Sequence, residues 1–494
     1  MTDVDGHAIG GRDIESTGGS EMNPQQRMHH HPFGRRPDRR TETLAGCALA
    51  AVLLVGAVAT TAAGRGGSSS STPIPQPSAA QLKAAELYDL PLAPKSARVD
   101  LTAQPFSNPT DVTNPLFPIS ELHSVLLNGK VDGKPFRTET TLLPDTRFIE
   151  WSDGQRVEVL VSQYTAYLDG RLEEVALDFY AQADDGSVWY LGEDVFNYNE
   201  QGYVADTGGT WLAGKEGPLA MIMPAAPTDG KAFRPENIPG LVFEEVTVKD
   251  SAKTVDGPQG PVTGAMVGTE LHDDGSFSDK IFAPGYGEFY SAHEGDVEAL
   301  ALAVPTDALP GPPPRELKVL SAGAHDIFDL AADKRWGAAS ATAQKMAAAW
   351  KSFQASEVPP RLVGPTSRSL EVLIAAVDAR LPAKARGAAI HVGFAALDLQ
   401  LRHRPPAGID LARFDLWAHR VLVDAAANDL GAVTGDVATL EWIRDRFVHV
   451  LAPVEVTRID QHLLDLRGAA SDEDLPAAAA EAADLIVSLA RIEP

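Results

Sequence analysis

The 494-residue sequence contains a single cysteine, Cys47, and far fewer basic than acidic residues. One cysteine excludes an intramolecular disulfide and a cysteine-based zinc site. There are 42 lysines and arginines against 68 aspartates and glutamates, which gives a formal net charge of −26. An acidic body repels nucleic acid and anionic lipid headgroups, so neither DNA nor RNA is expected as a partner.

The sequence also lacks the common catalytic and cofactor-binding motifs. It has no G-x-S-x-G, no P-loop and no G-x-G-x-x-G at a strand-to-helix turn. The segment at residues 293–297, H-E-G-D-V, departs from the metalloprotease motif H-E-x-x-H, and the EF-hand spacing is missing. We therefore predict no catalytic residues, no metal site and no cofactor, and favour a non-enzymatic protein.

The first part of the chain has the pattern of a membrane-targeting segment. Residues 1–43 are polar and are expected to be a disordered cytoplasmic leader. The apolar run 44–63 follows four arginines, so it is either a single-pass anchor or a secretory signal, cleaved near Ala59 or Ala63. A start at Met28 would give a signal peptide of ordinary length. Either way, the rest of the chain is expected outside the cytoplasm.

A flexible spacer is expected at residues 64–97, followed by a β-domain at 98–305. Turn-forming dipeptides recur through this region, and glycine after Asn or Asp is typical of tight hairpins. These dipeptides are Asn128-Gly129, Asp132-Gly133, Asp153-Gly154, Asp169-Gly170, Asp185-Gly186 and Asp274-Gly275. Short connections predict an antiparallel β-meander that forms a curved sheet, a half-barrel or a barrel.

Several segments of this region resemble a family of secreted bacterial β-domain proteins. The segments that carry the resemblance lie at residues 178–182, 185–194, 209–214, 221–225 and 282–287. The resemblance covers about residues 100–305. It implies a fold and an extracytoplasmic location, and no activity.

One segment of the β-domain has three adjacent large apolar residues, Met221, Ile222 and Met223. A run without alternation suits a segment that is covered on both faces. One interpretation is that these residues pack in the core, and the other is that they form a lip over an apolar ligand cavity. The expected ligand is apolar or derived from the cell wall; an envelope protein is the other expected kind of partner.

A Pro-rich linker at residues 306–317 separates the β-domain from an all-helical domain at 318–494. Apolar residues there recur at helical spacing. A short pattern of a charged residue, a large apolar residue, Gly or Pro, and Ala recurs at residues 335–338, 380–383, 429–432 and 474–477. It predicts about eight helices in hairpin pairs, stacked like tetratricopeptide repeats or arranged as an up-and-down bundle.

Two functions are compatible with this organisation. The favoured one is an envelope protein that acts as a binding or scaffold module outside the cytoplasm. The alternative is metal or haem handling through the helical domain, which contains several histidines, among them His391, His403, His419 and His449.

Overall fold

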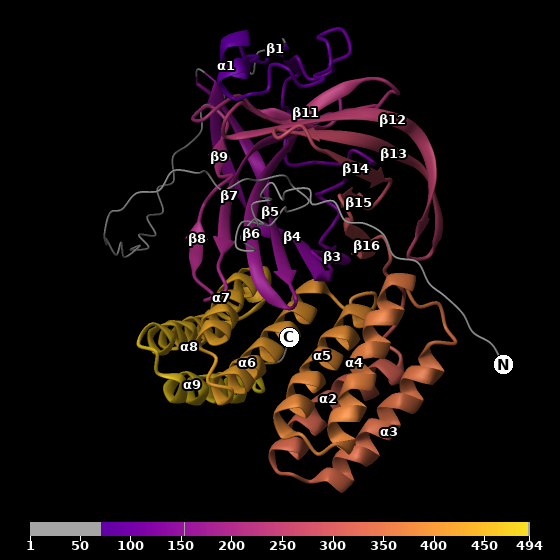
Figure 1. Cartoon of the computed structure of the whole chain (residues 1–494), viewed down its shortest axis with the longest axis vertical. Helices are drawn as coiled ribbons and strands as arrows, with labels where there is room; N and C mark the ends of the chain where they lie inside the picture. The colour runs from indigo at the N-terminus through magenta and orange to yellow at the C-terminus, as the bar shows by residue number, and fades with distance from the viewer. Residues whose placement is uncertain (1–70, 153, 493–494) are drawn as a thin grey trace, which may run out of the picture.

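The computed structural model describes residues 71–152 and 154–492. They form a large β-region and a helical region that covers one end of it (Figure 1). The leader 1–43, the apolar run 44–63 and the beginning of the spacer lie outside the described residues. Within those residues, no helix has the length and apolar character needed to cross a bilayer.

The main sheet has 14 strands, and all of its strand pairs are antiparallel. The strands are β3 (Ser124–Val131), β4 (Lys134–Ser152), β5 (Gln155–Leu168), β6 (Arg171–Gln182), β7 (Val188–Tyr198), β8 (Val204–Asp206), β9 (Trp211–Leu212), β10 (Ala220–Met223), β11 (Ala232–Ile238), β12 (Val242–Gly257), β13 (Gly260–His272), β14 (Phe277–Ala283), β15 (Gly287–His293) and β16 (Asp296–Val304). Before them come β1 (Thr72–Pro73), α1 (Ala79–Ala84) and β2 (Thr102–Ala103).

The strand order is β10-β7-β6-β5-β4-β3-β16-β15-β14-β13-β12-β11, and β8 and β9 pair with β7. The last strand, β16, thus pairs with β3 in the middle of the sheet. The two edge strands, β10 and β11, pack close together but form no ladder with each other. The predicted antiparallel β-region is confirmed as a curved sheet that does not close into a barrel.

Two of the predicted Asp-Gly hairpin turns have the backbone geometry that such turns need. Asp132 and Gly133 have φ values of 51° and 74°, and Asp169 and Gly170 have 50° and 76°. Positive φ at both central residues defines a turn whose twist matches the flanking strands. These turns connect β3 to β4 and β5 to β6.

The predicted turn at Asn128-Gly129 is wrong, because both residues lie inside β3. Gly129 pairs with Glu298 of β16 and Phe136 of β4. A Cβ atom at Gly129 would lie 1.6 Å from the backbone oxygen of Val297. The glycine therefore permits close approach of a neighbouring strand, which is the other common reason for glycine in a sheet.

The helical region contains eight α-helices in the described residues, in agreement with the predicted number. They are α2 (Arg315–Ala332), α3 (Trp336–Phe353), α4 (Pro360–Asp378), α5 (Pro382–Gln400), α6 (Pro406–Ala426), α7 (Leu430–Phe447), α8 (Pro453–Ser471) and α9 (Leu475–Leu489), with a 3₁₀ turn η2 (Val448–Val450) after α7. They pack as α2 with α3, α4 with α5, α6 with α7 and α8 with α9, which confirms the hairpin pairs.

The recurring sequence pattern marks the turn within each hairpin. The residue at or just before each copy adopts a left-handed conformation with φ between 56° and 59°. These residues are Lys334, Arg380, Asn428 and Glu473. The next amide donates to a carbonyl of the preceding helix's last turn, which is a common helix ending. Asp429 and Asp474 then cap the following helices by accepting from the amides of Ala432 and Ala477.

The helices form two groups of four, because α2 also packs on α5 and α6 also packs on α9. The contact between α5 and α6 connects the groups. Corresponding residues of the two groups share one sequence spacing: His325 corresponds to His419, Gly337 to Gly431, and Phe353 to Phe447.

The β-region and the helical region share hydrophobic clusters. One cluster joins Leu126 of β3 and Leu302 of β16 to residues of α2 such as Leu320. Another joins Val175 of β6 to α6 and α7. The sequence predicted two domains separated by a Pro-rich linker; in the structure, the ends of the strands bury apolar side chains against the helices.

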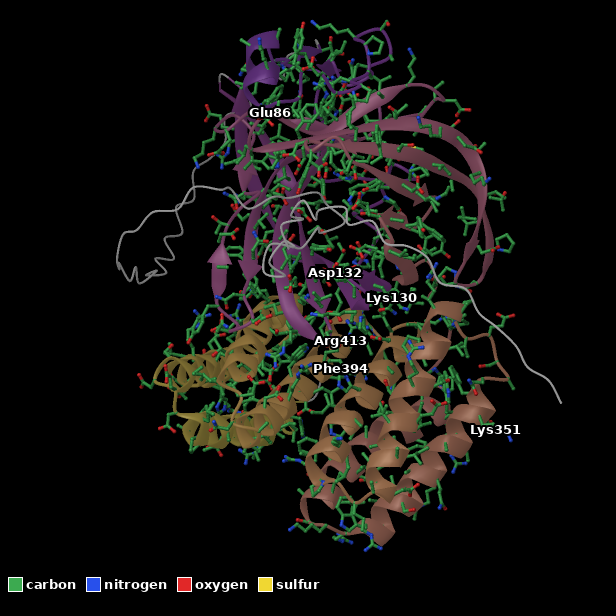
Figure 2. All side chains as sticks on the ribbon, in the orientation of Figure 1. Glu86, Lys130, Asp132, Lys351, Phe394 and Arg413 are labelled. Atoms are coloured by element: carbon green, nitrogen blue, oxygen red, sulfur yellow. The ribbon has the colours of Figure 1, made fainter. Side chains whose placement is uncertain are left out.

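A buried ion network reinforces this contact. Glu139 of β4 accepts from Arg446 of α7 and from Arg137, with N–O distances of 2.6 Å for both, and lies 3.8 Å from Arg413 of α6. Asp398 of α5 accepts from Arg137 at 2.7 and 2.8 Å and from Arg413 at 2.8 Å. Figure 2 shows Arg413 where the ends of the strands meet the helices. The network therefore joins β4 to three helices.

Candidate ligand cavity in the β-region

The curved sheet surrounds a cavity of about 140 Å³. Strand residues alternate between the two faces of a sheet, so every second side chain of a strand faces this interior. Part of the wall is apolar and comes from the strands and from the segment that precedes β3. These apolar residues include Phe117, Ile119, Leu122, Phe233, Val246 and Phe282.

The rest of the wall is unusually acidic for a protein interior. Seven strands contribute seven glutamates and one aspartate to the lining, and a single lysine, Lys280 of β14, is its basic residue. The acidic residues are Glu174, Asp178, Glu193, Glu236, Glu244, Glu270, Glu288 and Glu298. Buried acids are rare unless they are paired or protonated, because burial disfavours the charged form.

The ammonium group of Lys280 contacts two carboxyl groups of the cavity wall. Its Nζ lies 2.9 Å from Oε1 of Glu288 and 3.3 Å from Oε2 of Glu270. Glu288 is on β15 and Glu270 is on β13, the two strands that flank β14 in the sheet. Burial raises the pKa of Glu270 to about 8, and the nearby charge of Glu244 adds to this effect.

His272 lies beside this lysine-carboxylate group. Its Nδ1 is 3.5 Å from Oε1 of Glu244, and its Nε2 is 2.6 Å from the hydroxyl of Ser278. Burial opposes a charged imidazole, but the bond to Glu244 and the charge of Glu270 outweigh it, so the pKa of His272 is raised. The ligand atoms of His272, Glu244 and Glu270 lie within 4.8 Å of one another, so this group is able to hold a metal ion.

Glu298 of β16 is the second acid with a strongly shifted pKa. Burial raises that pKa to about 8, and the charge of Glu288 adds to the effect. One carboxylate oxygen accepts from the hydroxyl of Thr138, and the other, Oε2, is buried with no hydrogen-bond partner among the described residues. At neutral pH this carboxyl group is mostly protonated, and a bound cation would favour its ionised form.

Tyrosines lie among the acids on the β6–β7 side. Tyr180 and Tyr190 stack with ring centroids 4.9 Å apart, and the hydroxyl of Tyr190 donates to Oδ1 of Asp178 at 2.6 Å. Burial raises the pKa of Tyr190 well above its usual value, so its hydroxyl stays a neutral donor. Aromatic faces next to carboxylates are typical of sites for organic cations.

The residues of the predicted apolar lip lie on the edge strand β10. Met221 and Met223 are buried in the main hydrophobic cluster, and Ile222 lines the cavity. Met221 pairs with Trp189 of β7. The role of the three residues as a ligand lip stays a prediction.

The acids of the site were not recognisable as a group in the sequence. Glu193 and Asp194 are adjacent in β7, but Glu193 is 3% exposed and faces the cavity, whereas Asp194 pairs with Arg147 on the other face at 2.8 Å. Asp184 and Asp185 hold turns instead, by accepting from Ser107 and Ser187. The sequence signal for this site was the presence of acids at alternate positions of the strands. Which of these acids face the cavity is known only from the sheet.

No protein-family model matches the chain, and a comparison with curated proteins gives no significant match. The cavity itself is therefore the best indication of function.

Proposed function

We propose that the chain is a non-enzymatic binding protein whose β-region takes up a small organic cation with an apolar body. The observation that carries the proposal is the lining of eight acidic side chains against one lysine. A carboxylate removed from water is costly unless a proton or a cation neutralises it. A bound cation would provide this neutralisation, and the ammonium of Lys280 already lies against two of these carboxyl groups, Glu270 and Glu288.

The size and the wall of the cavity narrow the class of ligand. An engineered apolar cavity of about 150 Å³ binds benzene, and this cavity of about 140 Å³ is similar. Phe117 and Phe233 provide an apolar surface, and Tyr190, whose hydroxyl donates to Asp178, adds an aromatic side chain to the wall. A single ring with an ammonium arm therefore suits the site. The sequence predicted an apolar or cell-wall-derived ligand, and the lining adds the requirement of a positive charge.

The route of entry that we propose is the seam between the edge strands. Ile222 of β10 and Phe233 of β11 both line the cavity, and no ladder joins the two strands. Side-chain movement at this seam would open the interior without breaking backbone pairing. Location outside the cytoplasm, through an anchor or a signal at residues 44–63, is part of the proposal, as is the relationship to secreted bacterial β-domains.

The proposal is tested by calorimetric titration of the full chain with benzylammonium and, separately, with benzyl alcohol. The two probes have the same ring and differ in charge. We expect benzylammonium to bind and benzyl alcohol to bind about tenfold more weakly or worse, because a charge-assisted hydrogen bond contributes about 1.5–3 kcal/mol. Equal affinities, or no binding of benzylammonium, would contradict the proposal.

Adjacent residues of β7 provide matched variants for this test. Glu193→Gln removes one charge from the cavity wall, whereas Asp194→Asn removes one from the outer face, where the side chain is 40% exposed. We expect the first substitution to weaken benzylammonium binding about tenfold and the second to leave it unchanged. Equal effects would show that the overall charge of the protein, and not the cavity, attracts the cation.

A further inference from the structure

Two histidines and an aspartate come together where helix α2 meets helix α6. His325 of α2 and His419 of α6 have ring centroids 5.5 Å apart in an edge-on arrangement. Oδ2 of Asp415 lies 3.5 Å from Nδ1 of His419 and 3.9 Å from Nε2 of His325. One ligand atom from each of the three residues lies within 4.8 Å of the others.

The two histidines occupy corresponding positions in the two four-helix groups. His325 and His419 are separated by the same spacing as the corresponding turns of the two four-helix groups. The structure brings these corresponding positions into contact. Asp415 lies one turn before His419 on α6 and is on the same face of the helix.

The surroundings of His419 favour a ligand role. Its Nδ1 is 2.8 Å from the backbone oxygen of Asp415. A proton on Nδ1 would be donated to this oxygen, and Nε2 would then be the ligand atom of His419. The ring of Phe328 packs edge-on against it, with centroids 4.7 Å apart, and limits its rotation. A carbonyl that orients an imidazole in this way is common around protein-bound metals. The side chain of His325 is 48% exposed, so an ion has access from solvent.

We propose that His325, Asp415 and His419 bind a divalent transition-metal ion of the zinc type and thereby join α2 to α6. Two imidazole nitrogens and one carboxylate oxygen are ligands that zinc favours, and water completes such a site on its open side. The ion would link the two four-helix groups in addition to the contact between α5 and α6. These three side chains thus specify where the helical region would bind a metal ion.

The group of Glu244, Glu270 and His272 in the β-region is the competing metal site. There, the ammonium of Lys280 already lies 3.3 Å from Glu270 and provides a positive charge. A second cation would be repelled at that distance. In the part of the chain that the structure describes, the ion pairs of the helical group join only its own histidines to Asp415, so it is the better site for zinc.

The test is calorimetric titration of the full, chelator-treated chain with zinc chloride. His325→Ala should weaken zinc binding about tenfold or more, because one of three protein ligands is lost. His462→Ala is the matched control: this histidine is also on a helix but contacts Glu481 instead. His272→Gln tests the competing group. The histidines at residues 29–31 are present in every variant, so any binding by them cancels.

A second measurement follows the proposed link between the helices. Zinc should raise the melting temperature of the unmodified chain and of His462→Ala, but not that of His325→Ala, because only an ion bound to the folded state stabilises it. The proposal is supported if His325→Ala alone loses both effects. It is overturned if His325→Ala binds zinc normally, if only His272→Gln loses binding, or if the unmodified chain binds no zinc at about 1 mM.

Discussion

Replacement of Glu139 by Gln should strongly destabilise the protein while leaving the shape of the site almost unchanged. Glu139 is 4% exposed and faces three arginines: Arg137, Arg413 and Arg446. The substitution removes one negative charge from a buried network in which the three arginines face Glu139, Asp398 and Asp410. Removing one partner of a buried ion pair costs about 3–5 kcal/mol, because the opposite charge stays buried without compensation. That is a large part of the 5–15 kcal/mol typical of a folded protein.

The control is an exposed ion pair across the same boundary between the two regions. Arg171 of β6 contacts Asp429 at the beginning of α7 with an N–O distance of 2.8 Å, and the two side chains are 47% and 41% exposed. Arg171→Gln should cost at most about 1 kcal/mol, because solvent screens such pairs. Comparing the two variants shows whether the loss of stability depends on the burial of the ion pair or only on its position at the boundary between the two regions.

Urea unfolding, followed by tryptophan fluorescence and by far-ultraviolet circular dichroism, measures both effects. We expect one transition with both probes, because the two regions share hydrophobic clusters. The deficit of Glu139→Gln should shrink under acidic conditions. Burial opposes ionisation of Glu139, but the arginines outweigh it and hold its pKa well below the usual value. Its contribution is therefore present above the unfolded-state pKa and is lost as the pH falls. A loss no larger than that of Arg171→Gln would refute the reasoning.

Three further predictions concern stability. Burial raises the pKa of Glu270 and Glu298 to about 8. The ligand-free chain should therefore lose stability from about pH 5 to pH 9, by at most about 1.4 kcal/mol per pH unit for each group. Urea unfolding across this range measures the loss, and Glu298→Gln should make the dependence of stability on pH less steep. Gly129→Ala should destabilise the protein by about 3 kcal/mol or more, because the new Cβ atom clashes with the backbone of β16. Gly468→Ala, at an open position of α8, should stabilise the protein slightly. Equal melting temperatures of the two variants would contradict this prediction. A fragment of residues 318–494 should melt well below the full chain by calorimetry, because it exposes the apolar surface that β3, β6 and β16 cover.

Much of the fold follows from local sequence signals. The Asp-Gly dipeptides at 132–133 and 169–170 predicted tight turns, because glycine tolerates positive φ at no cost. The four copies of the helix pattern predicted the hairpins, because each ends one helix and begins the next. The same local rule failed at Asn128-Gly129. Glycine is needed there because the neighbouring strand β16 approaches closely, and not because the chain turns.

Long-range features had no local signal. Glu139 and Arg446 come from distant parts of the chain, and neither has a neighbouring residue that indicates the partner. The acidic cavity wall is assembled from seven strands that each contribute one or two residues. A glutamate on a strand predicts a solvent-facing side chain by default. Whether it faces inward depends on the register of the whole sheet, which becomes known only with the structure.

The central claim is that the acidic cavity exchanges protons for a bound cation. The most direct test is calorimetric titration of the full chain with benzylammonium near pH 7, repeated in two buffers with different heats of ionisation. Glu298 is mostly protonated at this pH, and a cation beside it lowers its pKa. The account therefore predicts that binding releases protons, and that less is released in Glu298→Gln. Binding without proton release, or with the same release in Glu298→Gln, would contradict it.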